Sequence, residues 1–185
     1  MAESLCLTCG ICCNGALFQD VGLQPGDDAA LLQSLGLPLK NIGRRQDAET
    51  LSTHPKSKIQ NRKFPQPCAA LEGCRCRIYP DRPTYCRQFE CLLLKDLLAG
   101  QVDLNAAHRV VRATRRRADK VLKLLRQLGD LDEHLNLKGR FQQTHRRLEA
   151  GPINAKTVAI LAELTFAMHR LNLLLRDSFY PDVDD

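Results

Sequence analysis

The distribution of cysteine is the feature that most constrains how this chain can fold. Nine cysteines fall into two blocks, Cys6 to Cys13 and Cys68 to Cys91, and none follows. A chain of 185 residues can bury enough apolar surface to fold without disulfides. An odd cysteine count also does not make a complete disulfide framework. Clustered thiols in such a chain therefore indicate metal or redox chemistry.

The expected compartment supports this interpretation. The first residues read MAESLCLTCGICC and lack the basic start and apolar run of a secretory signal. No stretch reaches the roughly 18 apolar residues of a membrane span, and apolar patches such as residues 171–176 are broken by charge. We therefore expect a cytoplasmic protein without a membrane partner, whose thiols stay reduced.

The spacing within the blocks is typical of metal ligands. The first block is Cys6-x2-Cys9-x2-Cys12-Cys13, and its C-x2-C-x2-C run matches the opening of the bacterial ferredoxin cluster motif. Structural zinc sites instead take four Cys or His ligands from two paired knuckles, for which Cys6/Cys9 and Cys86/Cys91 are candidates. The expected cofactor is an iron–sulfur cluster, which the ferredoxin-like run favours, or Zn2+.

Cys12 and Cys13 are adjacent, and adjacent cysteines rarely bind one metal because their side chains diverge. We expect them to face different centres, or one of them to lie beside the metal without binding it. Ordinary core cysteines or a redox disulfide are the alternative, but core cysteines do not cluster at two-residue spacing. Among the histidines, His54 is the single candidate ligand.

The second block reads Pro67-Cys68-x2-Leu71, then Cys76-x-Ile78-Tyr79-x2-Arg82-Pro83-x2-Cys86-Arg87-x-Phe89-x-Cys91. With the first block, over residues 4–93, it resembles the CxxCxxCC family of zinc- or iron-chelating cysteine-cluster proteins. The flagellin lysine methylases, which are iron–sulfur proteins, share this kind of motif but are larger, so their activity is not carried over. The resemblance implies eight metal ligands: Cys6, Cys9, Cys12, Cys13, Cys68, Cys76, Cys86 and Cys91. Cys74 is extra to the pattern.

Several residues between the cysteines of the second block have roles that their chemistry suggests. Arg82 and Arg87 could neutralise thiolate charge or donate hydrogen bonds to sulfur. Tyr79 and Phe89 are expected to shield the site from water. The formal charge of +6 counts each thiol as neutral. Eight thiolates on two zinc ions would change it by −8 + 4, leaving about +2, so part of the basic balance is counter-charge.

The fold expected is α+β and mostly helical. Between the blocks we expect a short strand at 17–21, a helix that Asp27 caps and Gly36 ends, and a loop with short strands at 40–67. Apolar residues at steps of three and four predict helices at 107–128 and 132–148, and a third helix that follows an Asn154 cap. A small Cys-rich metal-binding module, residues 1–95, would pack on this C-terminal helical bundle, residues 96–185, as one compact unit.

The function expected is metal binding. The alternatives are a metal-dependent modifying enzyme related to the methylases and a zinc-stabilised module that binds nucleic acid or another partner. Cations from Arg112 to Lys123 line one helix, but such a run is usually a solvated face and no aromatic residues interleave with it. There is no phosphate-binding glycine loop and no G-x-S-x-G, so no catalytic residue is assigned.

Overall fold

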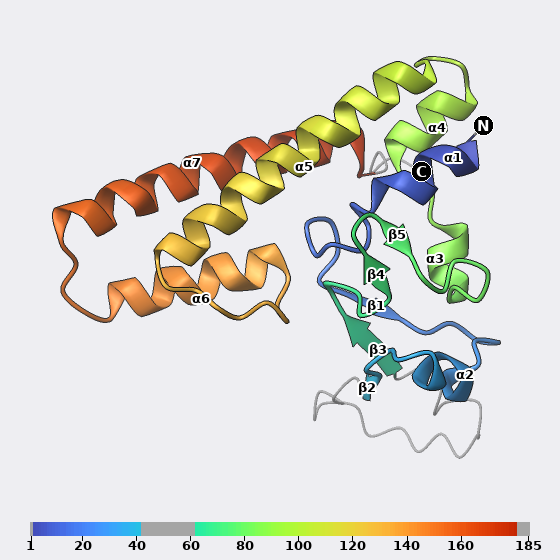
Figure 1. The fold of residues 1–185 in the computed structure, drawn as a ribbon, viewed down its shortest axis with the longest axis horizontal. Coiled ribbons are helices and arrows are strands. Elements are labelled where there is room, and N and C mark those ends of the chain that lie inside the picture. Colours follow the sequence, from blue (N-terminus) through green and yellow to red (C-terminus); the bar gives the residue numbers. More distant parts are fainter. Residues whose placement is uncertain (1, 42–61, 181–185) are drawn as a thin grey trace, which may run out of the picture.

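The computed structural model describes residues 2–41 and 62–180. These residues form the mostly helical α+β fold that the sequence predicts (Figure 1). The predicted loop at 40–67 falls largely outside the described residues, and His54 lies there too.

Short elements build the Cys-rich part of the chain. In chain order these are α1 (Ala2–Cys9), β1 (Asp20–Gly22), α2 (Ala29–Ser34), β2 (Lys40–Asn41), β3 (Arg62–Pro65), β4 (Leu71–Glu72), β5 (Arg75–Cys76), α3 (Thr84–Gln88) and α4 (Leu92–Leu98). The first three strands form an antiparallel sheet with β3 in the middle, and β4 and β5 form a hairpin. The sequence predicted none of the helices α1, α3 and α4.

A small core holds the sheet against α2. Val21, Leu32, Phe64 and Ile78 are all buried there, each from a different element or loop. The predicted cap of α2 was off by one residue, because Asp28 accepts hydrogen bonds from the N–H groups of residues 30 and 31. Asp27 does not cap the helix, and the predicted strand at 17–21 begins only at residue 20.

Three helices make up the second half, namely α5 (Leu104–Gln127), α6 (Leu137–Glu149) and α7 (Ala155–Ser178). Asp103 caps α5, and the predicted Asn154 cap of α7 is confirmed. The start predicted for α6 at residue 132 was wrong, since Asn136 caps it and the residues before it form turns. Gly129 has a φ of +80°, a conformation that glycine adopts without strain. It terminates α5, as the sequence predicts.

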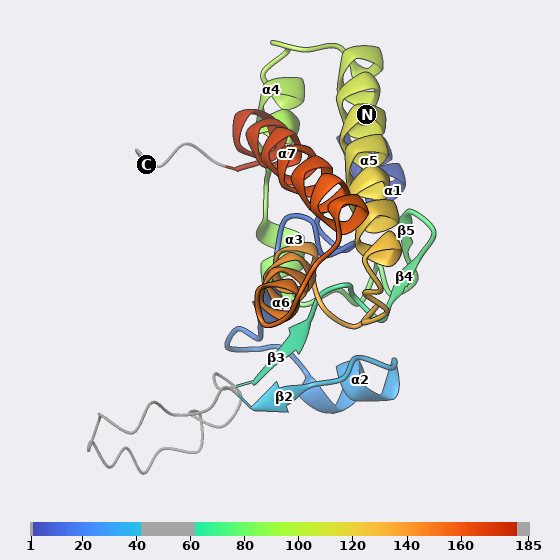
Figure 2. The same cartoon turned by 90° about the vertical axis from the view of Figure 1, so that its left-hand side faces the viewer.

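The three helices form an open arrangement instead of a closed bundle. Helix α7 runs back along α5, as both views show (Figure 2), and α6 also contacts α5. Between α6 and α7 a groove runs to the loop at residues 15–19, lined by Phe141, Met168 and Tyr180 among others. The predicted antiparallel pairing is thus confirmed for α5 with α7, while α6 and α7 diverge.

The sequence led us to expect no membrane span, but α7 is long and apolar enough to cross a membrane by length and composition. Core helices of soluble proteins meet the same two criteria. In this structure Leu164, Met168, Leu171 and Leu175 of α7 are buried, and 28% of its apolar stretch is buried within the described residues.

The larger core joins the two halves. Leu5 and Ile11 from the N-terminal block pack in one cluster with Val111 and Leu125 of α5 and Leu171 of α7. The predicted boundary between domains at residue 95 stays a prediction. The shared core means that the first cysteine block is positioned by the long helices.

Candidate metal centre

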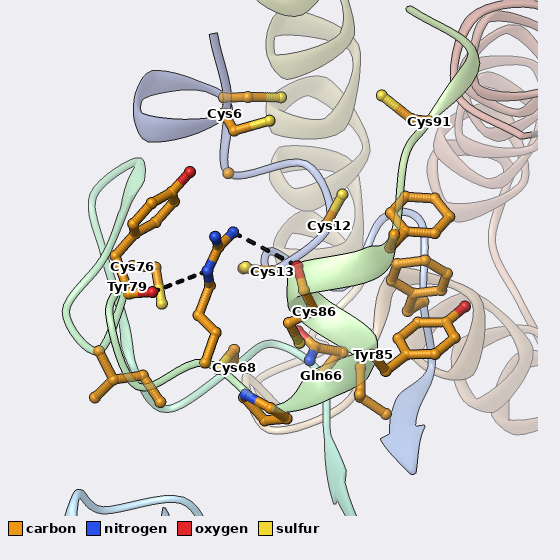
Figure 3. A pocket seen from close by; sticks show the side chains of 18 of the residues that line it. Cys6, Cys12, Cys13, Gln66, Cys68, Cys76, Tyr79, Tyr85, Cys86 and Cys91 are labelled. Atoms are coloured by element: carbon orange, nitrogen blue, oxygen red, sulfur yellow. Dashed lines mark hydrogen bonds between the residues drawn. The ribbon is translucent and has the colours of Figure 1, made fainter. Parts of the chain in front are cut away.

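All nine cysteines line one cavity. It lies where α1, the β4–β5 hairpin, α3 and the start of α4 meet, and about 100 Å³ of it is accessible to the centre of a water molecule (Figure 3). None of the nine cysteines forms a disulfide; Cys91 is buried, and the other eight are half-buried. The two blocks that lie more than 50 residues apart in the sequence therefore meet in space, as a shared site requires.

Helix α1 and the turn after it position the first block. Cys6 and Cys9 are three residues apart on α1, which places them on one face of the helix. Gly10 then reverses the chain with a φ of +68°, and a Cβ built at this position would lie 3.2 Å from the Cα of Cys74. Only glycine lets the first block approach the β4–β5 hairpin this closely.

The second block comes from four different local structures. Cys68 precedes the hairpin, and its N–H donates to the carbonyl of Cys13 at 2.8 Å. Cys76 ends β5, Cys86 lies on α3, and Cys91 immediately precedes α4. Short elements joined by turns thus aim each thiol separately at the cavity.

The eight predicted ligands separate into two groups of four. The first, which we call the α1 group, is Cys6, Cys9, Cys12 and Cys91. The second, the hairpin group, is Cys13, Cys68, Cys76 and Cys86. In Figure 3 the labelled members of the α1 group lie above those of the hairpin group. Cys12 and Cys13 lie where the two groups meet.

Electrostatics within the α1 group follow from this proximity. Burial, with a smaller contribution from the neighbouring thiols of Cys91 and Cys6, raises the pKa of Cys9 to about 12. Burial also raises the pKa of Cys12 well above its usual value, with Cys9 and Cys91 as the strongest thiol neighbours. The pKa of Cys91 is raised by burial and by Cys6. Each thiolate would thus need a cation to balance it.

The hairpin group behaves in the same way. Burial, with smaller contributions from Cys68 and Cys76, raises the pKa of Cys86 to about 12. Burial is also the main cause of the raised pKa values of Cys13, Cys68 and Cys76. The three strongest thiol neighbours of Cys13 are the other three members of its own group, and the weaker fourth is Cys9.

Backbone amides already favour the thiolate at four of these positions. Hydrogen bonds from backbone groups of Ile11, Ala70 and Ile78 lower the pKa of the cysteine two residues earlier, which is Cys9, Cys68 and Cys76 respectively. Amides at the start of α4 do the same for Cys91. Such N–H donors stabilise anionic sulfur and tune the potential of metal–thiolate centres.

Arg82 lies in the cavity as predicted. Its guanidinium stacks on the Tyr79 ring, with 3.6 Å from Cζ to the ring centroid, and its Nε donates to the Tyr79 carbonyl at 3.0 Å. Its charge lowers the pKa values of Cys76 and Cys86. Arg87, by contrast, does not line the cavity and donates to the hydroxyl of Thr84.

Aromatic residues line the other side of the cavity. Phe89 packs edge-on against Phe18, with ring centroids 4.9 Å apart, and stacks with Tyr85 at 6.0 Å. Tyr79 and Phe89 both line the cavity, in agreement with the shielding role that the sequence suggested. Phe18 and Tyr85 complete this apolar wall, and spacing alone did not indicate them.

Two further residues at the site were not predicted. Gln66 lines the cavity, is 2% exposed, and its Oε1 has no hydrogen-bond donor among the described residues. Arg115 of α5 donates through Nε to the carbonyl of Cys9 at 3.0 Å and also to the carbonyl of Thr8. The sequence holds no local signal for either, because both reach the site through tertiary packing.

The donor set fits a thiophilic metal. Among the described residues, no three His, Cys, Asp or Glu side chains already enclose a single ion. The cavity nevertheless gathers soft thiols, backbone donors to sulfur and the buried Gln66 amide, which has an unmet hydrogen-bonding requirement. Soft thiolate ligands select zinc, Cu(I) or iron–sulfur clusters. The choice of the eight individual ligands stays a prediction.

Comparison with known proteins gives one match. Searches of curated proteins and of solved structures returned no match. The model of the CxxCxxCC family, described as "Putative zinc- or iron-chelating domain", matches residues 5–103. This range is more than half of the chain and includes every cysteine and every residue that lines the cavity except Phe179. The chain therefore belongs to the CxxCxxCC family of metal-chelating domains.

Proposed function

We propose that this protein is an iron–sulfur protein whose cysteines hold at least one redox-active cluster. The observation that carries the proposal is the cavity of about 100 Å³ that the thiols surround. A cavity that holds a single water molecule needs only about 10–15 Å³ of this accessible volume. The space between the thiols is several times larger, so it has room for a cluster of several iron and sulfide ions.

The surroundings of the thiols support a cluster that changes its redox state. Backbone donors to sulfur occur at Cys9, Cys68, Cys76 and Cys91. Hydrogen bonds to sulfur and exclusion of solvent are two of the factors that set the reduction potential of a cluster. The apolar wall of Phe18, Phe89 and Tyr85 would exclude water on one side. When bound, the cluster would supply one-electron chemistry.

The protein's own residues would bind and orient the group. The thiols would be the ligands, and Arg82 would offset part of their negative charge, since its charge favours the thiolate forms of Cys76 and Cys86. The unpartnered Oε1 of Gln66 is an acceptor, so the positive metal ions of the group, and not their sulfur atoms, would stabilise it. No residue of the cavity is assigned a catalytic role.

The geometry gives less support to a nucleic-acid interface. Three cations of the basic α5 face have intramolecular partners, because Arg115 binds the carbonyls at the end of α1, Arg117 donates to the Arg170 carbonyl at 2.8 Å, and Lys120 pairs with Glu163 at 2.9 Å. These cations help hold α5 to α1 and α7. Fewer free charges then remain for phosphate contacts.

The test is metal analysis on the full chain purified without oxygen. Iron, acid-labile sulfide and a visible absorption band near about 400 nm from thiolate-to-iron charge transfer are expected. Reduction with dithionite should bleach the band, and reoxidation should restore it. The variant Cys74→Ala, which leaves all eight predicted ligands in place, serves as the control and should retain the band. A colourless protein with zinc alone, or a folded protein without metal, would contradict the proposal.

A further inference from the structure

We propose that the α1 group and the hairpin group each hold a metal centre of their own, so that the chain carries two. This inference rests on the proposed function only in requiring that the thiols bind metal. It does not depend on whether the metal is iron or zinc. Four thiols per group match the four ligands that both iron–sulfur clusters and structural zinc sites take from cysteine.

The adjacent pair at the middle of the site separates the groups. Cys12 and Cys13 lie in a turn that is closed by hydrogen bonds from the N–H groups of Cys13 and Asn14 to the carbonyl of Gly10, at 3.1 and 3.0 Å. Neighbouring side chains in such a turn leave the backbone in different directions. Figure 3 shows the Cys12 thiol on the side of Cys91 and the Cys13 thiol on the side of Cys68 and Cys76.

The two groups also belong to different hydrophobic cores. Cys6, Cys9, Cys12 and Cys91 pack with the large core that α5 and α7 complete. Cys68, Cys76 and Cys86 pack with the small core beneath the β1–β3–β2 sheet. Cys13 belongs to neither core but is tied to the second by the hydrogen bond from Cys68 to its carbonyl. Each set of four thiols is therefore supported by its own scaffold.

Each group also has a guanidinium held beside it. Arg115 of α5 donates through Nε to the carbonyl of Cys9, in the α1 group, at 3.0 Å. Arg82 donates to the Tyr79 carbonyl at 3.0 Å and to the carbonyl of Cys86, in the hairpin group, at 3.5 Å. The two cations lie at different groups, as two separate anionic centres would require.

The test is metal stoichiometry in variants that disable one group at a time. Cys91→Ala removes a ligand from the α1 group, and Cys86→Ala removes one from the hairpin group. The full chain is loaded without oxygen, once with iron and sulfide and once with Zn2+ alone, and bound metal is measured per chain by mass spectrometry. Cys74→Ala is the matched control, because Cys74 lines the same cavity but belongs to neither group.

With two centres, each single variant binds half of the wild-type metal, the double variant binds almost none, and the control binds the full amount. The absorption spectra of the two single variants should add up to that of the wild type. Circular dichroism identifies any variant that is unfolded, and for such a variant Cys12→Ala or Cys13→Ala replaces it within the same group.

A single variant that loses all metal while it remains folded would overturn the two-centre proposal, as would a wild-type chain that saturates at one zinc ion. Halving seen with zinc, in a protein that takes up no iron–sulfur cluster, would refute the proposed function alone. A chain that binds neither metal would refute both.

Discussion

The carboxylate of Asp27 joins two segments that are far apart in the sequence. Its Oδ1 accepts hydrogen bonds from the N–H and the hydroxyl of Thr84, both at 2.7 Å, and its Oδ2 accepts from the N–H of Gln24 at 2.7 Å. Thr84 is the first residue of α3, the helix that carries Cys86. Because Asp27 is buried, water replaces these contacts poorly. We therefore expect Asp27 to position α3 and, through it, one thiol of the hairpin group.

The cost of Asp27→Ala can be worked out from these contacts. A buried donor left without a partner costs about 1–3 kcal/mol, and three donors lose their acceptor. The donors lie in half-buried segments that water can partly reach, so we take the low end, about 3 kcal/mol in total. For a chain of this size each kcal/mol corresponds to about 2–4 °C in Tm. The expected fall in Tm is about 6–12 °C.

The neighbouring Asp28 offers a matched control. Its carboxylate accepts from the N–H groups of Ala30 and Leu31 at 2.9 Å each, but it is exposed and acts only as the cap of α2. Loss of such a cap costs about 1 kcal/mol. Asp28→Ala should therefore lower Tm by about 2–4 °C and leave the metal content unchanged.

The assay is thermal unfolding followed by circular dichroism at one fixed free-metal concentration, since bound metal itself raises Tm. Metal content is measured on the same samples. Asp27→Ala should lower both Tm and the metal held by the hairpin group. If Asp27→Ala costs no more than Asp28→Ala, or if metal retention is unchanged, the carboxylate does not position α3 and the reasoning is wrong.

Three other substitutions test contacts elsewhere. Arg115→Met should lower stability by about 1.5–3 kcal/mol and weaken metal retention, because the carbonyls at the end of α1 lose a charged donor. Arg116 is exposed, so the control Arg116→Met should change neither property. Equal effects of the two substitutions in thermal unfolding would argue against the Arg115 contact. Gln66→Leu should cost the metal-free protein less than about 1 kcal/mol, since it removes an unpartnered buried oxygen, and a large loss in urea unfolding would mean that the amide has a partner. Asp130→Ala should cost about 3–5 kcal/mol, because the buried Arg140, whose Nε lies 2.6 Å from Asp130 Oδ2, is left without its ion-pair partner. If the pair acts as a unit, the double variant with Arg140→Met should recover most of this stability.

Much of the helical half could be predicted because its signals are local. Steps of three and four along α5 and α7, the Asn154 cap and the break at Gly129 each depend on residues within a turn or two. The start of α6 was missed because apolar periodicity does not mark the first residue of a helix, and the capping hydrogen bond is made by Asn136. Helix α1 was missed because its eight residues contain no capping signal and little periodicity.

The sequence by itself indicated metal-binding chemistry, since spacings of two residues between cysteines recur without a structural need for disulfides. It also indicated that Cys12 and Cys13 diverge, because that follows from covalent geometry. Only the tertiary structure decided which thiols lie together. Cys91 joins Cys6, and Cys13 joins Cys68, because two separate cores bring these segments into contact. Spacing constrains only neighbours along the chain, whereas contacts between distant segments depend on the packing of the whole fold.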